Sequence, residues 1–455
     1  MVEPRIVPRD EHSLSRRDID PDALKVLYRL RQSDHVAYLV GGSVRDLLLG
    51  RRPKDFDIGT SAHPYQVKKL FRNCWIIGRR FRLAHVKFGA KVIEVATFRR
   101  QVEPGEEVVQ DGVPAVDSSL AEVTHLLHRD NTFGTPEEDA FRRDFTINAL
   151  FYDVASFSII DYVGGIDDVR AGVVRAIGDP DVRVLEDPVR MIRAVALASR
   201  LDFTIDPPVL AAIRTHRREI AQSSPPRLLE EYYKILRAGA SEKTFRWLRE
   251  LGLLEPISDE LHRGATDALW QSLAAVDRYR QGFAGTPETL TNPVLAGSLL
   301  VPLGIPLQAG RPKRRAEEVI AAGDGQDDTA VPRARRPPRE PVLRLGSLPL
   351  ARRDIEQLRQ VLSLQRKLGD VSASPRAKRA FASRPIFKDA LTWLEIHGGK
   401  PDLVEHWQAI LAEGGEPSAG EAVEPAEAEG EAPALPPPFK RRRRRRRRRP
   451  VRPAS

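Results

Sequence analysis

The spacing of apolar residues along the chain divides it into a mixed α/β part followed by a helical part. Leu24, Leu27 and Leu30 recur at helical spacing, which predicts an amphipathic helix over residues 21–34. Predicted strands then cover residues 36–40, 56–58, 92–98, 145–154 and 157–162, with a short helix at 44–49. We expect residues 21–180 to form one mixed domain, preceded by a disordered polar N-terminus over residues 1–20.

From residue 181 onward, the apolar residues follow helical spacing almost throughout. Predicted helices cover residues 184–201, 208–220, 226–238 and 241–251, so a helical region is expected over 181–307. Residues 308–342 predict a flexible basic connector, and helical spacing returns over 343–412. The last segment, 413–455, is acidic and then arginine-rich, which predicts a disordered tail. The whole pattern is typical of an α+β protein.

The amino-acid composition indicates the kind of partner and compartment to expect. The formal net charge of +10 favours a polyanionic partner, although solubility alone would also explain it. Cys74 is the single cysteine and cannot form an intramolecular disulfide, which fits a reducing compartment. The first residues are charged and show no secretory leader, and the most apolar stretch, 294–307, is short and interrupted by two prolines. We therefore expect a cytoplasmic protein that does not associate with a membrane.

The strongest chemical signal begins at a glycine turn. Gly41, Gly42 and Ser43 stand between a predicted strand and a predicted helix. Bare backbone N–H groups at such a turn can approach a triphosphate, which the start of a helix also favours. Arg45 adds a charged donor for phosphate. The turn is therefore a candidate nucleotide-binding element.

Paired carboxylates follow this turn. Asp55 and Asp57 alternate along a predicted strand, so both should project from one face. Such a pair suits two Mg²⁺ ions, with Mn²⁺ as an alternative, because hard cations prefer oxygen ligands and leave positions for phosphate and water. Glu94 is the candidate third catalytic carboxylate, since an acid inside a β-run is costly without a cation. Ordinary surface acids, and a solvent-facing glutamate on an edge strand, are the alternatives.

With these residues in view, the sequence resembles the class II tRNA nucleotidyltransferase and poly(A) polymerase superfamily. The resemblance rests on the element at 41–57 and on Arg-Arg-Asp-Phe-Thr-Ile-Asn-Ala at 142–149. Asp-Tyr-Val-Gly-Gly at 161–165 and Glu-Asp-Pro-Val-Arg-Met-Ile-Arg-Ala at 186–194 add to it. The resemblance covers about residues 25–255. It implies a polymerase-β-like nucleotidyltransferase head followed by helical neck, body and tail domains.

The segment at 142–149 also has a physical interpretation of its own. Arg142 and Arg143 can neutralise phosphate, while Asp144 and Asn148 can bond a ribose or orient an arginine. A salt-bridged start of a helix or strand is the alternative. The resemblance assigns contacts with the sugar and phosphates of an incoming nucleotide to this segment.

A helix predicted over residues 186–194 would place Asp187 and Arg190 on one face. An acceptor beside a donor matches the Watson–Crick edge of adenine and, equally, that of cytosine. The resemblance assigns this base-reading role to the two residues, with Arg193 as a supporting charge, whereas an intrahelical ion pair is the alternative. The element at 226–231 resembles the family's next helix and is interpreted as structural.

Residues 76–88, Ile-Ile-Gly-Arg-Arg-Phe-Arg-Leu-Ala-His-Val-Lys-Phe, are similar to a stretch that distinguishes bacterial poly(A) polymerases. We interpret His85 within it as a packing or RNA-proximal residue rather than a metal ligand. The resemblance implies addition of AMP from ATP to RNA 3′ ends, with release of pyrophosphate, in mRNA polyadenylation and RNA turnover. Two alternatives stay open: a CCA-adding tRNA nucleotidyltransferase, and a noncatalytic RNA-binding protein of the same fold.

The arginine run near the C-terminus predicts contact with RNA. Side chains that neutralise phosphates release counterions and give affinity without sequence preference. Nonspecific binding to any polyanion is the alternative. The candidate RNA-binding residues are Arg441, Arg442, Arg443, Arg444 and Arg445.

Overall fold

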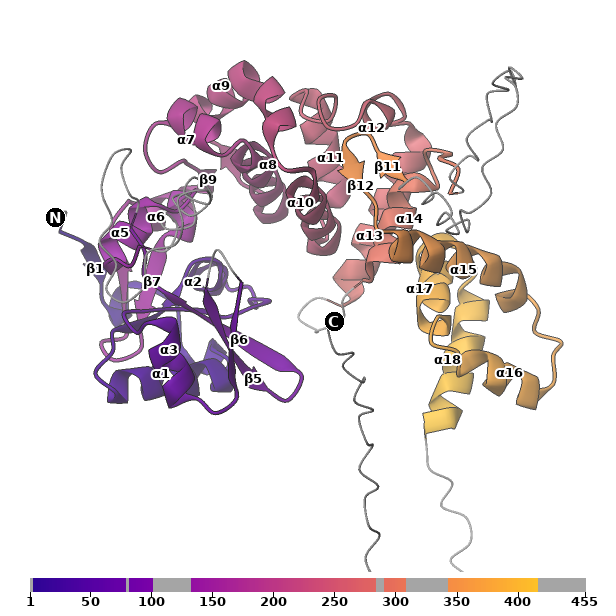
Figure 1. Cartoon of the computed structure of the whole chain (residues 1–455), viewed down its shortest axis with the longest axis horizontal. Helices are drawn as coiled ribbons and strands as arrows, with labels where there is room; N and C mark the ends of the chain where they lie inside the picture. The colour runs from indigo at the N-terminus through magenta and orange to yellow at the C-terminus, as the bar shows by residue number, and fades with distance from the viewer. Residues whose placement is uncertain (1–2, 79–81, 101–131, 284–289, 308–342, 416–455) are drawn as a thin grey trace, which may run out of the picture.

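The computed structural model describes residues 3–78, 82–100, 132–283, 290–307 and 343–415. A sheet-containing head lies at one end, and the helices form an arc that leads from it to the C-terminal helices (Figure 1). The predicted connector at 308–342 and nearly all of the predicted tail, including its arginine run, lie outside the described residues. Among the residues that are described, no helix is both long and apolar enough to cross a membrane.

The head is built on an eight-stranded sheet of order β1-β8-β7-β2-β3-β6-β5-β4. Neighbouring strands run antiparallel except β3 and β6, which are parallel. The strands are β1 (Arg5–Val7), β2 (Ala37–Val40), β3 (Asp57–Thr60), β4 (Cys74–Ile77), β5 (Leu83–Phe88), β6 (Lys91–Thr97), β7 (Leu150–Asp153) and β8 (Ser158–Asp161).

Helices α1 (Pro21–Gln32) and α3 (Pro64–Leu70) cover one face of this sheet (Figure 1). The side chain of Asp20 accepts a hydrogen bond from the backbone N–H of Asp22 at 2.8 Å and so caps α1. The apolar stripe of α1 packs on alternate residues of the strands, because only every second residue of a strand faces the core. The short helix α2 (Gly42–Leu48) begins directly after β2, at the glycine turn.

The expectation of a disordered N-terminus over residues 1–20 is wrong for the part that the structure describes. β1 pairs antiparallel with β8 along the edge of the sheet, and two 3₁₀ turns, η1 (Arg9–Glu11) and η2 (Arg16–Asp18), follow. Val7 and Leu14 are fully buried in the core of the head. An unpaired edge strand offers free backbone donors and acceptors, and the N-terminal segment satisfies them on β8.

The predicted strand over residues 145–154 is correct only in its second half. Residues Thr146–Asn148 form a 3₁₀ turn, η4, and β7 starts at Leu150. α6 (Gly165–Ala171) holds this turn, since Thr146 donates to Asp168 at 2.6 Å. Gly165 packs so closely that an added Cβ would lie 2.3 Å from the carbonyl oxygen of Thr146. α5 (Pro136–Phe141) leads into the same segment.

The predicted continuous helix through residues 186–194 is interrupted. α7 (Pro180–Glu186) ends before Asp187, whose backbone is extended (φ −148°, ψ 91°), and α8 (Val189–Leu201) begins after Pro188. The physical reason is Pro188, because a proline disfavours the helical conformation of the residue that precedes it. Asp187 therefore stands between two helices rather than on the face of one.

The remaining helices form the arc and the C-terminal part. One continuous core joins them to the head. α18 extends to Gly415, slightly past the expected boundary at 412. The elements are β9 (Val173–Val174), β10 (Thr204–Ile205), α9 (Pro207–His216), η5 (Arg217–Gln222), α10 (Pro225–Ala238), α11 (Ser241–Glu250), α12 (Asp259–Arg263), α13 (Asp267–Gly282), α14 (Asn292–Leu300), β11 (Arg344–Leu345), β12 (Leu348–Pro349), α15 (Arg352–Leu368), α16 (Pro375–Ala382), α17 (Phe387–His397) and α18 (Pro401–Gly415).

Candidate active site

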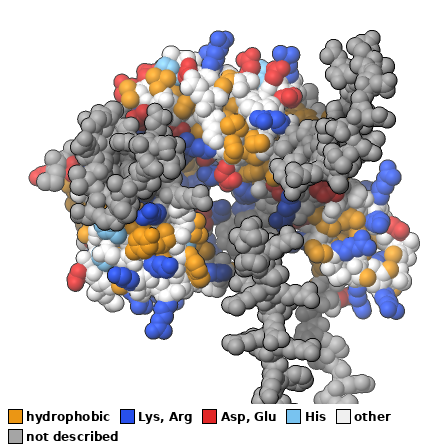
Figure 2. Space-filling view, viewed as in Figure 1, with side chains coloured by type: hydrophobic (Ala, Val, Ile, Leu, Met, Phe, Trp, Pro, Cys, Tyr) orange, Lys and Arg blue, Asp and Glu red, His pale blue; other side chains and the backbone are white. Residues whose placement is uncertain are grey.

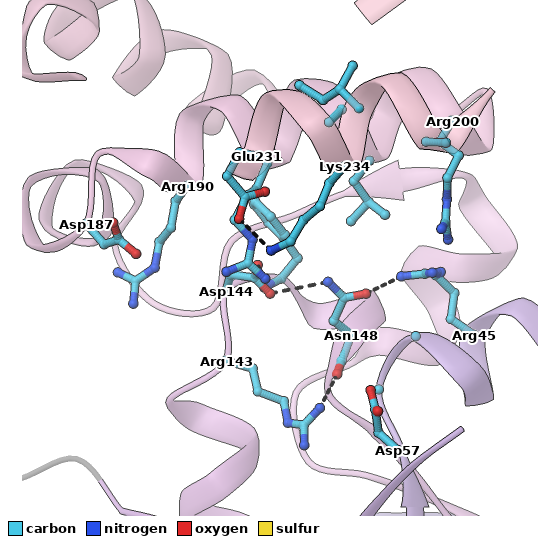
Figure 3. Close-up of a pocket in the computed structure, with 18 of the residues that line it drawn as sticks. Arg45, Asp57, Arg143, Asp144, Asn148, Asp187, Arg190, Arg200, Glu231 and Lys234 are labelled. Carbon is cyan, nitrogen blue, oxygen red and sulfur yellow. Dashed lines mark hydrogen bonds and ion pairs between the residues drawn. The ribbon is translucent and has the colours of Figure 1, made fainter. Parts of the chain in front are cut away.

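A pocket of about 890 Å³ lies between the head and helices α7, α8 and α10 (Figure 3). Lys and Arg side chains are prominent in the hollow between the head and the helical arc (Figure 2). The cationic residues that line the pocket are Arg45, Arg142, Arg143, Arg190, Arg193, Arg200, Arg227 and Lys234. The acidic residues that line it are Asp57, Asp144, Glu186, Asp187 and Glu231. An excess of cations suits a polyanionic ligand such as a triphosphate.

The glycine turn forms one wall of this pocket. Gly41 has a positive φ of 71°, and an added Cβ there would lie 2.8 Å from Nη1 of Arg143. Gly42 leaves similarly little room, since its Cβ would lie 3.3 Å from Nη2 of Arg45. The bare backbone of the turn thus lies next to two guanidinium groups. Ser43 is different from what the sequence predicted, because its side chain is buried and donates to the carbonyl of Val40 at 2.9 Å, away from the pocket.

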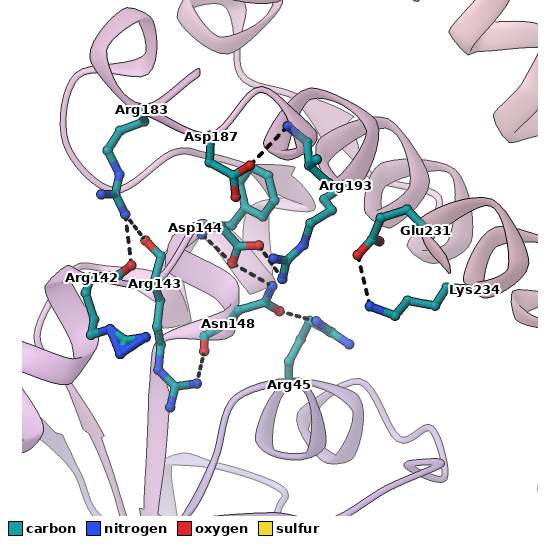
Figure 4. Close-up of polar contacts among 12 residues, drawn as sticks. Arg45, Arg142, Arg143, Asp144, Asn148, Arg183, Asp187, Arg193, Glu231 and Lys234 are labelled. Atoms are coloured by element: carbon teal, nitrogen blue, oxygen red, sulfur yellow. Dashed lines mark hydrogen bonds and ion pairs between the residues drawn. The ribbon is translucent and has the colours of Figure 1, made fainter. Parts of the chain in front are cut away.

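A network of polar contacts fixes the segment predicted at 142–149 (Figure 4). Asp144 forms an ion pair of 2.7 Å with Arg193 of α8, and its other oxygen accepts hydrogen bonds from the Asn148 amide and the backbone N–H of Phe145. Burial alone would raise the pKa of Asp144, but Arg193 and these donors hold it below its ordinary value. The amide oxygen of Asn148 accepts from Arg45. Four predicted site residues therefore act as one connected unit.

Arg143 is held in place from three sides. Its guanidinium donates to Asp139 at 2.8 Å and to the carbonyl of Asn148 at 2.9 Å, and it lies over the ring of Phe151. From α7, the buried Arg183 donates to the carbonyl oxygens of Arg142 and Arg143 at 3.0 and 2.6 Å. Sequence reasoning did not select Arg183, because the two carbonyl oxygens that it joins are backbone atoms far away along the chain.

Asp57 projects into the pocket from the start of β3 (Figure 3). Glu94 lies beside it, because β3 and β6 pair Ile58 with Val95 and the two acids precede these residues. Burial and, after it, the nearby carboxylates of Glu94 and Asp55 together raise the pKa of Asp57 to about 6, against the opposing effect of Arg143. Asp57 makes no direct hydrogen bond or ion pair with another described residue.

The positions of Asp55 and Glu94 correct two details of the sequence analysis. Asp55 precedes β3 rather than lying on it, its side chain is 72% exposed, and it does not line the pocket. Glu94 lies on a central strand, yet its side chain is 48% exposed and pairs with His85, whose Nε2 is 3.4 Å from Oε1. It is thus neither an edge-strand residue nor a buried acid. The predicted same-face pair of Asp55 and Asp57 is therefore not formed. Asp57 alone lies in the pocket, and Glu94 and Asp55 are close to it.

The donor set at Asp57 fits a divalent cation that takes further ligands from its substrate. In the ranges that the structure describes, no three histidine, cysteine, aspartate or glutamate side chains are grouped closely enough to hold a metal unaided. Besides burial, which is the larger cause, repulsion from the carboxylates of Glu94 and Asp55 nevertheless contributes to the raised pKa of Asp57. A cation between them would relieve that repulsion, and Mg²⁺ normally keeps water or phosphate oxygens among its ligands.

Asp187 and Arg190 both line the pocket, at the end nearer the helices (Figure 3). Arg227 donates to both oxygens of Asp187, at 2.9 and 2.5 Å. Arg190 donates to Glu186 at 2.9 Å and to the carbonyl of Arg183 at 2.7 Å. The intrahelical ion pair considered as an alternative for Asp187 and Arg190 does not form, since each has a different partner.

The structure adds pocket residues that the sequence analysis did not select. Arg227, Glu231 and Lys234 of α10 face the cavity, and Glu231 pairs with Lys234 at 2.9 Å (Figure 4). The element at 226–231, interpreted as structural, therefore also lines the site. Its signal was present in the sequence, because residues 227, 231 and 234 are polar at helical spacing and so share one face.

Comparison with known families agrees with this architecture. Residues 37–175 match the Poly A polymerase head domain, and residues 202–264 match the family described as a probable RNA and SrmB-binding site of polymerase A. Residues 344–449 match the polymerase A arginine-rich C-terminus. The three matches follow one another along the chain, over the head, the arc and the C-terminal part.

Individual relatives lie in two groups. Poly(A) polymerase I of Salmonella typhi is 50% identical over 262 residues, which are 58% of this chain and 55% of the relative. The CCA-adding enzyme of Lactobacillus johnsonii is 36% identical over 235 residues, which are 52% of this chain and 54% of the relative. The chain thus spans about half the length of the curated relatives it matches.

Among solved structures, the Bacillus stearothermophilus CCA-adding enzyme in complex with CTP is similar, with a TM-score of 0.54 and 25% identity over 87% of this chain and 83% of that one. The fold and the pocket define the class, a nucleotidyltransferase head joined to a helical body. Within that class, the chain belongs to the bacterial poly(A) polymerase branch of the tRNA nucleotidyltransferase and poly(A) polymerase superfamily.

Proposed function

We propose that this protein is a template-independent polynucleotide adenylyltransferase that adds AMP from ATP to RNA 3′ ends. The observation that carries the proposal is that one pocket holds the glycine turn, Asp57 and the pair Asp187 and Arg190. A triphosphate cradle, a catalytic carboxylate and a base-reading pair are the parts that such a reaction requires. The similarity to poly(A) polymerase I supports this assignment.

Each group of pocket residues has a task in the proposed reaction. The backbone of the glycine turn, with Arg45 and Arg143 close to it, binds the triphosphate. The ion pair of Asp144 with Arg193, together with Asn148, holds the sugar-binding segment in position. Asp57 and Glu94, with Asp55 at the rim, would hold Mg²⁺, which lowers the pKa of the RNA 3′-hydroxyl and stabilises the leaving pyrophosphate when bound.

Choice of the base is assigned to Asp187 and Arg190. An acceptor next to a donor can pair with adenine or with cytosine, so these two groups alone would not separate ATP from CTP. Arg227 fixes both oxygens of Asp187, and a fixed pair can distinguish bases of different size. We infer that this contact favours ATP.

A CCA-adding tRNA nucleotidyltransferase is the second candidate, favoured by the 36% identical relative and by the solved neighbour. The test is incorporation of each of the four nucleoside triphosphates into an oligoadenylate primer and into a tRNA that lacks its terminal residues. Sustained AMP incorporation on the oligoadenylate supports our proposal. Addition of CMP to the truncated tRNA would identify a CCA-adding enzyme, and no incorporation at all would favour a noncatalytic RNA-binding protein.

The arginine run supports the same substrate class. We propose that Arg441–Arg445 and their neighbours tether RNA through its phosphates. Removing residues 440–455 should then weaken RNA binding at low salt and reduce its salt dependence, because fewer counterions are released. A cytoplasmic setting and participation in mRNA processing remain part of the proposal.

A further inference from the structure

Within the described residues, the outward-facing side chains of β4, β5 and β6 are exposed or half-buried, and this part of the sheet leads away from Asp57. Side chains alternate along β4, β5 and β6, with Cys74 and Val86 buried in the core and their neighbours facing outward. On the outward face, the strand register pairs Trp75 with His85, and His85 with Glu94. This stretch includes the described parts of the segment 76–88, which the sequence analysis singled out and which the proposed reaction does not use.

Together with Asp57, these residues form a row across four neighbouring strands, which we call the outward row. Its members are Asp57 of β3, Glu94 of β6, His85 of β5 and Trp75 of β4. Three strand spacings separate its ends by about 14 Å. That length equals about four stacked bases at their usual rise.

The far end of the outward row is apolar and exposed. Trp75 is 53% exposed, and Ile77, two residues further along β4 on the same face, is 50% exposed. Val92 of β6 lies on this face as well and is 41% exposed. The exposed Lys87 projects from the same face, and its side chain has no ion pair within the described part of the chain. Trp75 and Ile77 are next to each other on the outward face of β4, and neighbouring exposed apolar side chains are more common at interaction sites than on plain surface. An aromatic ring next to a cation is the combination that binds single-stranded nucleic acid.

The position of the outward row relative to the glycine turn indicates that it would bind the RNA primer rather than the incoming nucleotide. β2 leads into the turn on one side of β3, and β6, β5 and β4 lie on the other side (Figure 1). Nucleophile and leaving group stand roughly in line in phosphoryl transfer. If the triphosphate lies at the turn, the attacking 3′-hydroxyl must approach Asp57 from the side of the outward row.

We propose that the outward row is the path of the RNA 3′ end, with Trp75 as a stacking platform for a base a few nucleotides upstream of the reacting hydroxyl. The inference rests on the proposed adenylyltransferase function and extends it to a primer subsite on the head. His85, which pairs with Glu94, lies between Asp57 and Trp75 in the outward row and would contact the RNA there. Lys87 contributes a charge for the backbone.

The test compares Trp75→Ala and Trp75→Phe with the unaltered full chain. The KM for oligoadenylate primers is measured from the dinucleotide upward, together with the KM for ATP. In the unaltered protein the primer KM should fall once the primer is long enough to reach Trp75. Trp75→Ala should abolish that fall and raise the KM for longer primers about tenfold, whereas the KM for the dinucleotide and for ATP stays unchanged. Trp75→Phe should retain most of the effect, because a phenyl ring still stacks.

Tyr65→Ala is the matched control. Tyr65 is an aromatic residue of similar exposure, 59%, but it lies on α3, which covers the opposite face of the sheet. An unchanged dependence of KM on primer length in Trp75→Ala would overturn the proposal. Equilibrium binding of a fluorescent oligoadenylate without ATP separates the two claims. A chain that adds no AMP, but loses oligoadenylate binding in Trp75→Ala and not in Tyr65→Ala, would refute the adenylyltransferase assignment and still support the platform.

Discussion

At the scale of single residues, the ionised carboxylate of Asp57 destabilises the folded protein. Burial and two neighbouring carboxylates raise its pKa to about 6, so the folded state disfavours the ionised form. An aspartate in an unfolded chain titrates near pH 4. Ionised Asp57 therefore lowers the free energy of unfolding. This destabilisation is absent below about pH 4, grows as the pH rises to about 6, and is fully present above that value.

Asp57→Asn should consequently stabilise the protein while it abolishes activity. In a metal chelator and above pH 6, we expect its melting temperature to exceed that of the unaltered chain by about 2 °C, and near pH 4 the difference should vanish. Thermal unfolding followed by circular dichroism at both pH values checks this. Added Mg²⁺ should raise the melting temperature of the unaltered chain and leave Asp57→Asn unchanged. Equal Mg²⁺ responses in the two proteins would contradict the metal assignment.

The sequence predicted residues whose role depends on local geometry better than those whose role depends on register. Gly41 and Gly42 could be recognised because a turn between a strand and a helix needs them. Ser43 and Asp55 could not be placed, since the exact residues at which α2 and β3 begin decide whether these side chains face the pocket. Arg183 could not be predicted, because it binds backbone carbonyls, which every residue has.

At the scale of elements, the same limit applies to pairing over long distances. The helices α1, α10 and α11 were predicted almost to their ends, because helical periodicity is local. β1 was missed, since three residues carry no periodic signal and their partner β8 is more than a hundred residues away. The break between α7 and α8 could have been predicted from Pro188, and that break is what lets Asp187 reach α10.

Arg227 tests the consequence of this break. Arg227→Ala frees both oxygens of Asp187, so this half of the proposed base-reading pair is no longer held in place. We expect the ratio of kcat/KM for ATP to that for CTP to fall about tenfold, a change of about 1.4 kcal/mol in discrimination. Steady-state incorporation with each nucleotide on one oligoadenylate primer measures the ratio.

Lys234→Ala is the control for Arg227→Ala, because Lys234 lines the same face of α10 but contacts Glu231 instead of Asp187. It should leave the ratio for ATP and CTP near that of the unaltered chain. An unchanged ratio in Arg227→Ala would mean that the contact with Asp187 is structural and that selection lies elsewhere in the pocket.

At the scale of the whole molecule, the pocket belongs to neither half alone. The glycine turn comes from the head, and Asp187 and Arg190, the proposed base-reading pair, come from the helical part. Binding of one nucleotide therefore depends on how rigidly the two halves are joined. Arg183 is the clearest joint, since it is buried on α7 and donates to the carbonyls of Arg142 and Arg143 in the head, while Glu186 balances its charge.

Arg183→Met keeps the volume of the side chain and removes its donors. Two half-buried carbonyls then lose a charged hydrogen-bond donor, at a cost of about 1–3 kcal/mol. If the joint serves the nucleotide, the KM for ATP should rise about tenfold while the melting temperature falls by only a few degrees, and Arg183→Lys should recover part of the loss. Arg218→Met, on the exposed turn η5, should change neither quantity. A lower melting temperature with an unchanged KM for ATP would show that Arg183 stabilises the fold without ordering the pocket. The nucleotide would then bind equally well whether or not Arg183 joins the head to α7.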